Sequence, residues 1–277
     1  MTTESPSTEP STELGNELGT ELGNEPTVDT TSLNKAAGIP AGMDAKDTAV
    51  MAEPSPLIPA ATVILVRDGE NGLETLMVER VGRGNFAGFS VFPGGRVDPE
   101  DFDPTAPEDE FVASRHAAVR EAREEVALEV ILETLVPLSR WVPPPFEMKR
   151  FGTWFFVAPA IAGDIAMSEG ELTAFHWLTP AQALAEATAG TRTLAPPTWV
   201  SLHQLSPYSS VDEALSDLGA KEPKHFETWP LQRKPMVLAW EPDVSYRQPL
   251  EEVDLDAPGP RHRLYMHDGP WEYVVTD

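Results

Sequence analysis

Residues Arg120-Glu-Ala-Arg-Glu-Glu-Val-Ala-Leu128 contain three glutamates at the spacing of one helical face. Glu121, Glu124 and Glu125 stand at positions i, i+3 and i+4, so a helix brings their carboxylates together. Adjacent carboxylates repel one another unless a cation neutralises them, and hard divalent ions such as Mg²⁺ prefer oxygen ligands. Arg120 lies four residues before Glu124 and can hold that carboxylate in place. The pattern indicates either a metal-binding face or an ordinary solvated Arg/Glu face.

The same segment also has an apolar side. Ala118, Ala122 and Val126 recur every four residues, and Val119 joins them. This periodicity predicts a helix over residues 110–126 that packs its apolar side on a core.

A double glycine precedes this helix, in Phe92-Pro-Gly-Gly-Arg-Val-Asp-Pro-Glu-Asp101. The stretch follows a short predicted strand over residues 89–92, so the glycines lie between a strand and the helix. Glycine lets the backbone approach a ligand or ion closely, and the Gly95 carbonyl could complete a metal site.

Together these residues resemble the signature of the Nudix hydrolase family, G-x5-E-x7-R-E-U-x-E-E-x-G-U, in which U is aliphatic. The resemblance covers roughly residues 58–190 and implies metal-assisted hydrolysis of a phosphoanhydride with Mg²⁺ or Mn²⁺. It implies catalytic roles for Arg120, Glu124 and Glu125, with either glutamate as the general base. The implied metal ligands are Gly95, Glu121, Glu124 and Glu125.

The sequence departs from this signature at three places. The first glutamate of the signature is Asp101, a shorter carboxylate in an acidic loop that we expect to be solvated. The spacer from Asp101 to Arg120 contains 18 residues rather than seven. The glycine near the end is Ala127, which the fold tolerates only if that position needs no left-handed backbone.

The enlarged spacer and the Val91-Phe-Pro-Gly-Gly-Arg-Val-Asp98 entry resemble a Nudix subgroup that includes coenzyme A diphosphatases and uncharacterised bacterial relatives. The resemblance implies a nucleotide-type substrate: a nucleoside diphosphate linked to another group, with coenzyme A or acyl-coenzyme A as one candidate. Four arginines could contact its phosphates, although such arginines are more often surface or ion-pairing residues: Arg80, Arg83, Arg96 and Arg150. Four aromatic residues could stack on a base or lie in the core: Trp141, Phe146, Trp154 and Phe155.

The predicted elements define an α/β fold, a Nudix-type α/β/α sandwich with a mixed sheet. β-Branched runs and alternation predict strands over residues 61–67, 74–80, 89–92, 133–141, 151–158 and 175–178. Capping and periodicity predict further helices over residues 181–189, from Pro197 through Leu205, and over 212–218.

Composition divides the chain into three parts. Residues 1–56 hold ten acids, two lysines and no aromatic residue, which predicts a disordered acidic tail. Residues 57–190 are the expected Nudix domain. Residues 191–277 are an expected extension, helical and then extended, packed on that domain.

The whole 277-residue chain is acidic, with a formal charge of −25. It has no Lys/Arg-rich run, so we expect neither duplex nucleic acid nor a membrane surface as a partner. It has no cysteine, which excludes thiolate chemistry and, with the lack of a signal peptide, favours the cytoplasm. Folds of this kind often form homodimers, but no sequence feature shows an interface.

Two other functions stay open. The altered Asp101 and Ala127 are compatible with a catalytically weak or inactive Nudix-fold sensor that binds a nucleotide without cleaving it. The acidic tail could recruit a basic partner.

Overall fold

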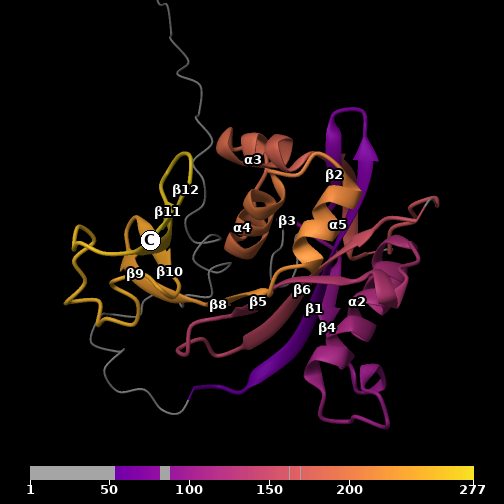
Figure 1. The fold of residues 1–277 in the computed structure, drawn as a ribbon, viewed down its shortest axis with the longest axis horizontal. Helices are drawn as coiled ribbons and strands as arrows, with labels where there is room; N and C mark the ends of the chain where they lie inside the picture. Colours follow the sequence, from indigo (N-terminus) through magenta and orange to yellow (C-terminus); the bar gives the residue numbers. More distant parts are fainter. Residues whose placement is uncertain (1–53, 82–87, 162, 169) are drawn as a thin grey trace, which may run out of the picture.

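The computed structural model describes residues 54–81, 88–161, 163–168 and 170–277. Residues 1–53 of the predicted disordered tail lie outside the described residues. The candidate Arg83 also lies outside them. Within them, an eight-stranded mixed sheet has the strand order β3-β2-β1-β6-β5-β8, with β4 paired to β1 and β7 to β2 (Figure 1). Its strands are β1 (Leu57–Gly69), β2 (Gly72–Arg80), β3 (Ser90–Val91), β4 (Gly94–Arg96), β5 (Val136–Val142), β6 (Arg150–Pro159), β7 (Leu172–Leu178) and β8 (Lys224–Glu227).

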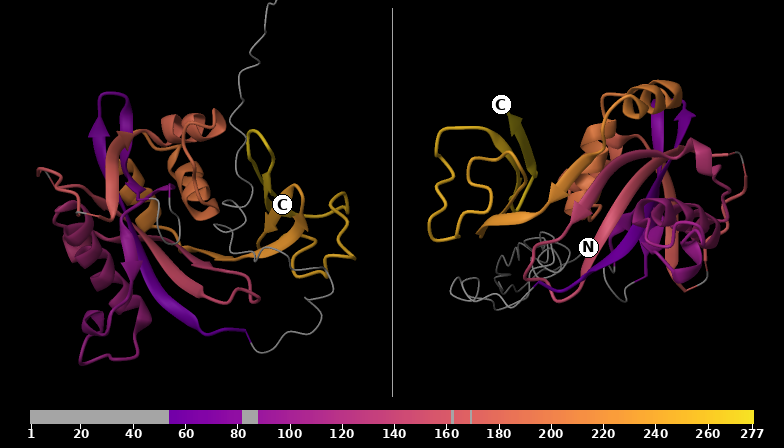
Figure 2. Two further views of the ribbon diagram at one scale, coloured as in Figure 1. Left: turned by 180° about the vertical axis from the view of Figure 1, so that it is seen from behind. Right: turned by 60° about the horizontal axis from the view of Figure 1, so that its bottom comes forward.

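Helices cover both faces of this sheet, as Figures 1 and 2 show. Alternate residues of β1 point to opposite faces: Ala61, Val63 and Leu65 lie in one core, and Ile64 and Val66 in the other. The helices are α2 (Glu110–Val126), α3 (Pro180–Thr188), α4 (Pro196–Leu205) and α5 (Val211–Gly219). The first core contains the apolar side of α2, and the second contains residues of α3, α4 and α5. Helices on both faces of the sheet confirm the predicted α/β/α sandwich.

Helix α2 begins and ends as the sequence predicts. The Asp109 carboxylate accepts a hydrogen bond from the Val112 N–H and caps the first turn. Its buried side is rich in alanine, which lets the helix axis approach the sheet closely. The buried positions are Ala113, Ser114, Ala117, Ala118, Ala122, Glu125 and Val126.

The end of α2 corrects one expectation. Ala127 adopts φ 58° and ψ 25°, so this position does need the left-handed backbone that we expected an alanine to exclude. Backbone bonds stabilise the turn: the Ala127 N–H donates to Arg123, and the N–H groups of Ala166 and Ser168 donate to Val126 and Glu125. These bonds offset the cost of placing a Cβ in the left-handed region.

Several segments differ from their predicted extent, and β1 and β7 begin before the strands predicted over 61–67 and 175–178. The strand predicted over 133–141 begins only at Val136, because Leu132–Thr134 forms a 3₁₀ turn. The extended tail forms a second, four-stranded sheet of the described chain, seen at the left of Figure 1. Its strands are β9 (Trp229–Arg233), β10 (Met236–Ala239), β11 (Arg261–Met266) and β12 (Glu272–Thr276).

The C-terminal extension is continuous with the main domain. Strand β8 pairs in parallel with β5 and extends the main sheet. Phe226 of β8 stacks on Trp141 of β5 at 4.2 Å between ring centroids, and Trp240 packs edge-on against both rings. Residues 191–277 thus share one hydrophobic core with residues 57–190.

The four aromatic residues considered for base stacking lie in the cores. Trp141, Phe146 and Phe155 are buried in the core that the extension shares. Trp154 packs on Phe111 in the core beneath α2. No helix in the described parts of the chain has the length and apolar character needed to cross a membrane.

Candidate active site

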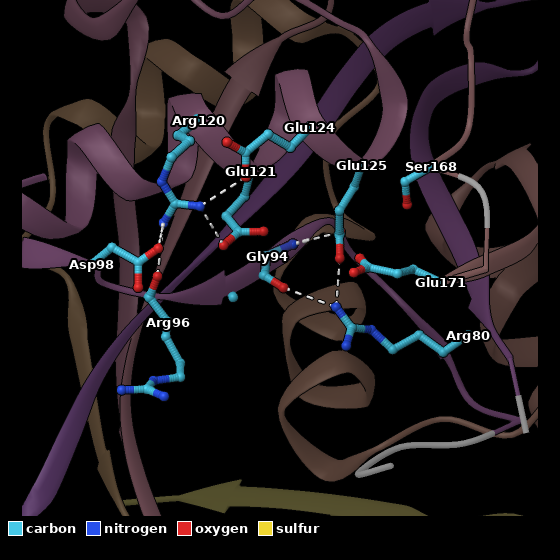
Figure 3. A pocket seen from close by; sticks show the side chains of 11 residues that line it. Arg80, Gly94, Arg96, Asp98, Arg120, Glu121, Glu124, Glu125, Ser168 and Glu171 are labelled. Carbon is cyan, nitrogen blue, oxygen red and sulfur yellow. Dashed lines mark hydrogen bonds and ion pairs between the residues drawn. The ribbon is translucent and has the colours of Figure 1, made fainter. Parts of the chain in front are cut away.

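The predicted glutamates and the double glycine meet in one pocket of about 460 Å³ (Figure 3). It lies where α2 passes the end of β2 and the short strand β4. The pocket collects every predicted metal and catalytic residue, together with Arg80 and Arg96. The lining residues are Arg80, Gly94, Gly95, Arg96, Asp98, Arg120, Glu121, Glu124, Glu125, Ser168 and Glu171.

Gly94 has to be glycine because β4 lies close to β1, and a side chain at Gly95 would displace the Glu121 carboxylate of α2. A Cβ on Gly94 would stand 2.5 Å from the Ala61 carbonyl oxygen, which belongs to the paired strand β1. A Cβ on Gly95 would stand 2.3 Å from Oε1 of Glu121. The glycines therefore let a β-strand backbone reach the carboxylates of the helix.

Arg120 connects the acidic side chains around it. Its Nε and Nη2 donate to the two carboxylate oxygens of Asp101 at 3.1 and 2.9 Å. Its Nη1 donates to Glu121 at 2.9 Å and to Glu124 at 3.0 Å. These carboxylates raise the pKa of the Arg120 guanidinium, with Asp101 as the largest cause. Arg120 therefore holds two of the three signature glutamates in place.

Asp101 corrects the expectation of a solvated acidic loop. It is only 5% exposed, and the bidentate pair with Arg120 gives its buried charge a partner. Its carboxylate also accepts a hydrogen bond from the Asp98 N–H at 2.9 Å. The shorter side chain therefore still reaches the arginine that a glutamate would hold.

Glu125 occupies the deepest position. It is 2% exposed, and its Oε2 accepts a hydrogen bond from the Gly94 N–H at 3.0 Å. Its Oε1 accepts from Nη2 of Arg80 at 2.5 Å. Burial raises the pKa of Glu125 to about 7, against the opposing effect of Arg80. Glu125 is therefore a carboxylate whose negative charge is costly without a cation beside it.

The other two glutamates differ in exposure. The Glu121 side chain is 13% exposed, and burial raises its pKa in spite of the bonds from Arg120. The Glu124 side chain is 53% exposed and is held by Arg120 alone among the described residues. Glu124 is therefore the carboxylate most open to water and substrate.

The donor set of this pocket suits a divalent cation. Its lining residues include five carboxylates and three guanidinium groups, a net charge of −2 that one divalent ion would balance. In the described part of the chain, no three acidic or histidine side chains converge closely enough to chelate an ion as they stand. The reason is visible in Figure 3, where Arg120 and Arg80 hold the glutamates.

Only some of the arginines considered for phosphate binding lie at the pocket. Arg80 and Arg96 line the pocket, and the Arg96 guanidinium points away from the glutamates in Figure 3. Arg150 is buried in β6 outside the lining, where it donates to the carbonyls of Pro143 and Ser55 at 3.0 and 3.1 Å.

Sequence reasoning missed Asp98, Ser168 and Glu171 as pocket residues. Glu171 precedes β7, and its carbonyl accepts a hydrogen bond from the Val81 N–H just after β2. Such cross-strand pairing depends on a register that the sequence does not encode locally.

The fold is that of the Nudix pyrophosphohydrolases. The NUDIX domain model matches residues 56–197, just over half of the chain, and the chain therefore belongs to the Nudix family. The NUDIX hydrolase of Alicyclobacillus acidocaldarius superposes with a TM-score of 0.53 and 25% identity, covering 61% of this chain and 99% of that one.

Two further solved structures have lower TM-scores. The MutT NUDIX hydrolase of Burkholderia pseudomallei has a TM-score of 0.42 and 20% identity, covering 55% of this chain and 99% of that one. The NUDIX domain of Shewanella oneidensis NrtR, complexed with ADP ribose, has a TM-score of 0.40 and 18% identity, covering 59% of this chain and 92% of that one. Among curated protein sequences, none matches this chain.

Proposed function

We propose that this Nudix pyrophosphohydrolase cleaves the pyrophosphate bond of a nucleoside diphosphate linked to another group, with Mg²⁺ or Mn²⁺ in the pocket. The observation that carries the proposal is the convergence of three signature glutamates on the Gly94–Gly95 backbone in a pocket with a net charge of −2. Glu121, Glu124 and Glu125 would hold the cation, with a Gly95 backbone oxygen as a further ligand. When bound, the ion would polarise phosphate oxygens and lower the pKa of a bound water.

Four side chains in and around the pocket have different roles in the proposed mechanism. Arg120 orients Glu121 and Glu124 through its Nη1, while Asp101 fixes the other side of the same guanidinium. Glu124 is the stronger candidate for the general base, because its side chain is half exposed and meets solvent. Glu125 is buried and tied to the backbone of Gly94, which favours a ligand role.

The arginines that line the pocket suit a polyanionic substrate. Two of them, Arg80 and Arg96, line the pocket and would contact phosphate oxygens after a change of side-chain conformation. Such contacts matter in a chain of formal charge −25, which repels a polyanion at long range. We infer a nucleotide-type small molecule as the substrate, and coenzyme A or an acyl derivative is the candidate that the enlarged spacer favours.

A product assay over a substrate panel tests this proposal. The panel contains coenzyme A, acetyl-coenzyme A, NADH, ADP-ribose, a dinucleoside polyphosphate and nucleoside triphosphates, each with Mg²⁺ or Mn²⁺ and with a chelator. Metal-dependent release of two phosphate-containing products supports hydrolysis. Cleavage of coenzyme A to a 3′,5′-bisphosphate supports the subgroup, whereas cleavage of another compound alone contradicts it.

The sensor alternative predicts ligand binding without turnover. The two departures that suggested it leave the signature glutamates in the pocket, because Asp101 still pairs with Arg120 and Ala127 still adopts the left-handed turn. Nucleotide binding with no cleavage at saturating metal would contradict hydrolysis and favour the sensor.

A further inference from the structure

The buried carboxylate of Glu125 shares an ion pair with Arg80 that no other pocket arginine duplicates in the described part of the chain. Nη2 of Arg80 lies 2.5 Å from Oε1, while the Glu125 side chain is 3% exposed. Leaving such a buried charge without a partner is strongly unfavourable. Arg80 is therefore the counter-ion that makes an ionised Glu125 tolerable in this structure.

Arg80 also has an anchor that does not depend on Glu125. The same Nη2 donates to the Gly94 carbonyl at 3.0 Å, while the Gly94 N–H donates to Oε2 of Glu125 at 3.0 Å. The Arg80 side chain is 31% exposed and lines the pocket. The guanidinium thus has the open pocket beside it, into which it would turn on leaving Glu125.

The ion pair conflicts with the ligand role proposed for Glu125. Oε1 cannot coordinate a divalent cation through the lone pair that accepts from Arg80, and a guanidinium beside such an ion is repelled. Glu121 and Glu171 add negative charge close to Glu125, which strengthens the attraction of this position for a cation. A divalent cation on Glu125 and the Arg80 guanidinium therefore compete for the same carboxylate.

We propose that Arg80 is the exchangeable counter-ion of Glu125: it neutralises Glu125 in the metal-free enzyme and turns to a substrate phosphate when Glu125 takes a divalent cation. This inference rests on the proposed function for its substrate half, since a diphosphate supplies the second partner. The Arg80 guanidinium would then bind first Glu125 and later a substrate phosphate. The metal would therefore bind before the substrate.

Metal affinity in the absence of substrate is the primary test. Arg80→Gln removes the competing charge, so we expect Mn²⁺ titrated calorimetrically to bind at least about fivefold more tightly than to the parent protein. Arg96→Gln is the matched control, because it removes the same charge from the same lining without an ion pair to Glu125. We expect it to tighten Mn²⁺ less than about twofold.

Unchanged or weaker Mn²⁺ binding by Arg80→Gln would overturn the proposal. Equal tightening by both variants would also overturn it, because the effect would then reflect only the general field of the pocket. If Arg80→Gln does not fold, ¹⁵N NMR of the parent decides: the Arg80 side-chain Nε resonance, assigned with Arg80→Lys, should shift on addition of Mg²⁺. An Nε resonance that does not move would contradict the exchange.

Turnover tests the second role. At saturating Mn²⁺ and with the best substrate of the panel, Arg80→Gln should raise KM at least about fivefold, despite its tighter metal binding. An unchanged KM would contradict the phosphate contact. If the parent protein cleaves nothing on the panel, the proposed function fails, while the Mn²⁺ titration still decides the exchange at Glu125.

Discussion

The Arg120–Asp101 pair shows how one substitution in the signature is accommodated. The Asp101 carboxylate is buried and accepts from Nε and Nη2 of Arg120, whose Nη1 holds Glu121 and Glu124. Its loss would leave part of the Arg120 charge unpaired and free the guanidinium to move. In the proposed mechanism, Asp101 is thus a positioning residue that acts through Arg120.

Asp101→Asn should lower the free energy of unfolding by about 2 kcal/mol, because a charged bidentate pair becomes a weaker neutral one. Urea denaturation measures this loss. Asp98→Asn is the matched control: its carboxylate is half exposed and 3.8 Å from Arg120, so its loss should cost less than about 1 kcal/mol. Equal losses in the two variants would contradict the role given to Asp101.

Glu147 predicts a pH dependence of stability. Burial raises the pKa of its carboxyl to about 8, so the folded protein keeps a proton that the unfolded chain releases at a lower pH. The contribution of Glu147 to stability is therefore present below its ordinary pKa and is lost as the pH rises toward about 8. Glu147→Gln should gain stability relative to the parent between pH 5 and pH 8.5.

Thermal unfolding at the two pH values measures this difference. Glu133→Gln, at an exposed position, removes the same charge and serves as the control. A difference between Glu147→Gln and the parent that is the same at both pH values would contradict the buried carboxyl.

At the scale of elements, the end of α2 holds an unfavourable backbone conformation. Ala127 adopts φ 58°, where glycine has no Cβ penalty. Ala127→Gly should therefore raise the free energy of unfolding by about 1 kcal/mol, measured by urea denaturation. Ala189 ends α3 with φ −76°, so Ala189→Gly gains nothing and should lose stability. Destabilisation by Ala127→Gly would show that the alanine methyl group has a role that we have not identified.

Local patterns predicted most elements and the centre of the site. The alanine period of α2, its bounds and its glutamate face could be read because an amphipathic helix is a local pattern. The second sheet could not, because the pairing of β10, which ends at Ala239, with β11, which begins at Arg261, spans a long loop. The same limit hid Glu171, which the β2–β7 pairing brings to the pocket.

At the scale of the whole molecule, the C-terminal extension is part of the main fold. Phe226 is fully buried between Trp141 and Trp240 and joins the extension to β5. Phe226→Ala should cost about 3–5 kcal/mol in free energy of unfolding, and the loss should appear in one cooperative transition. Val275→Ala, at an exposed position of the same extension, should cost less than about 0.5 kcal/mol.

Two separate unfolding transitions, with the site intact after the first, would contradict this integration of the extension. A single transition would mean that the pocket and the extension are stabilised together, so that changes in the distant sheet act on activity through stability.

The central claim is that the pocket on α2 hydrolyses a pyrophosphate bond, and the turnover of two glutamate variants tests it most directly. With a substrate identified from the panel, Glu124→Gln should lower kcat by about 10²–10⁴-fold even at Mn²⁺ concentrations that saturate the variant. Glu125→Gln should weaken Mn²⁺ binding as well as turnover. If both variants release products as fast as the parent protein, the reaction does not take place at this site and the account is wrong.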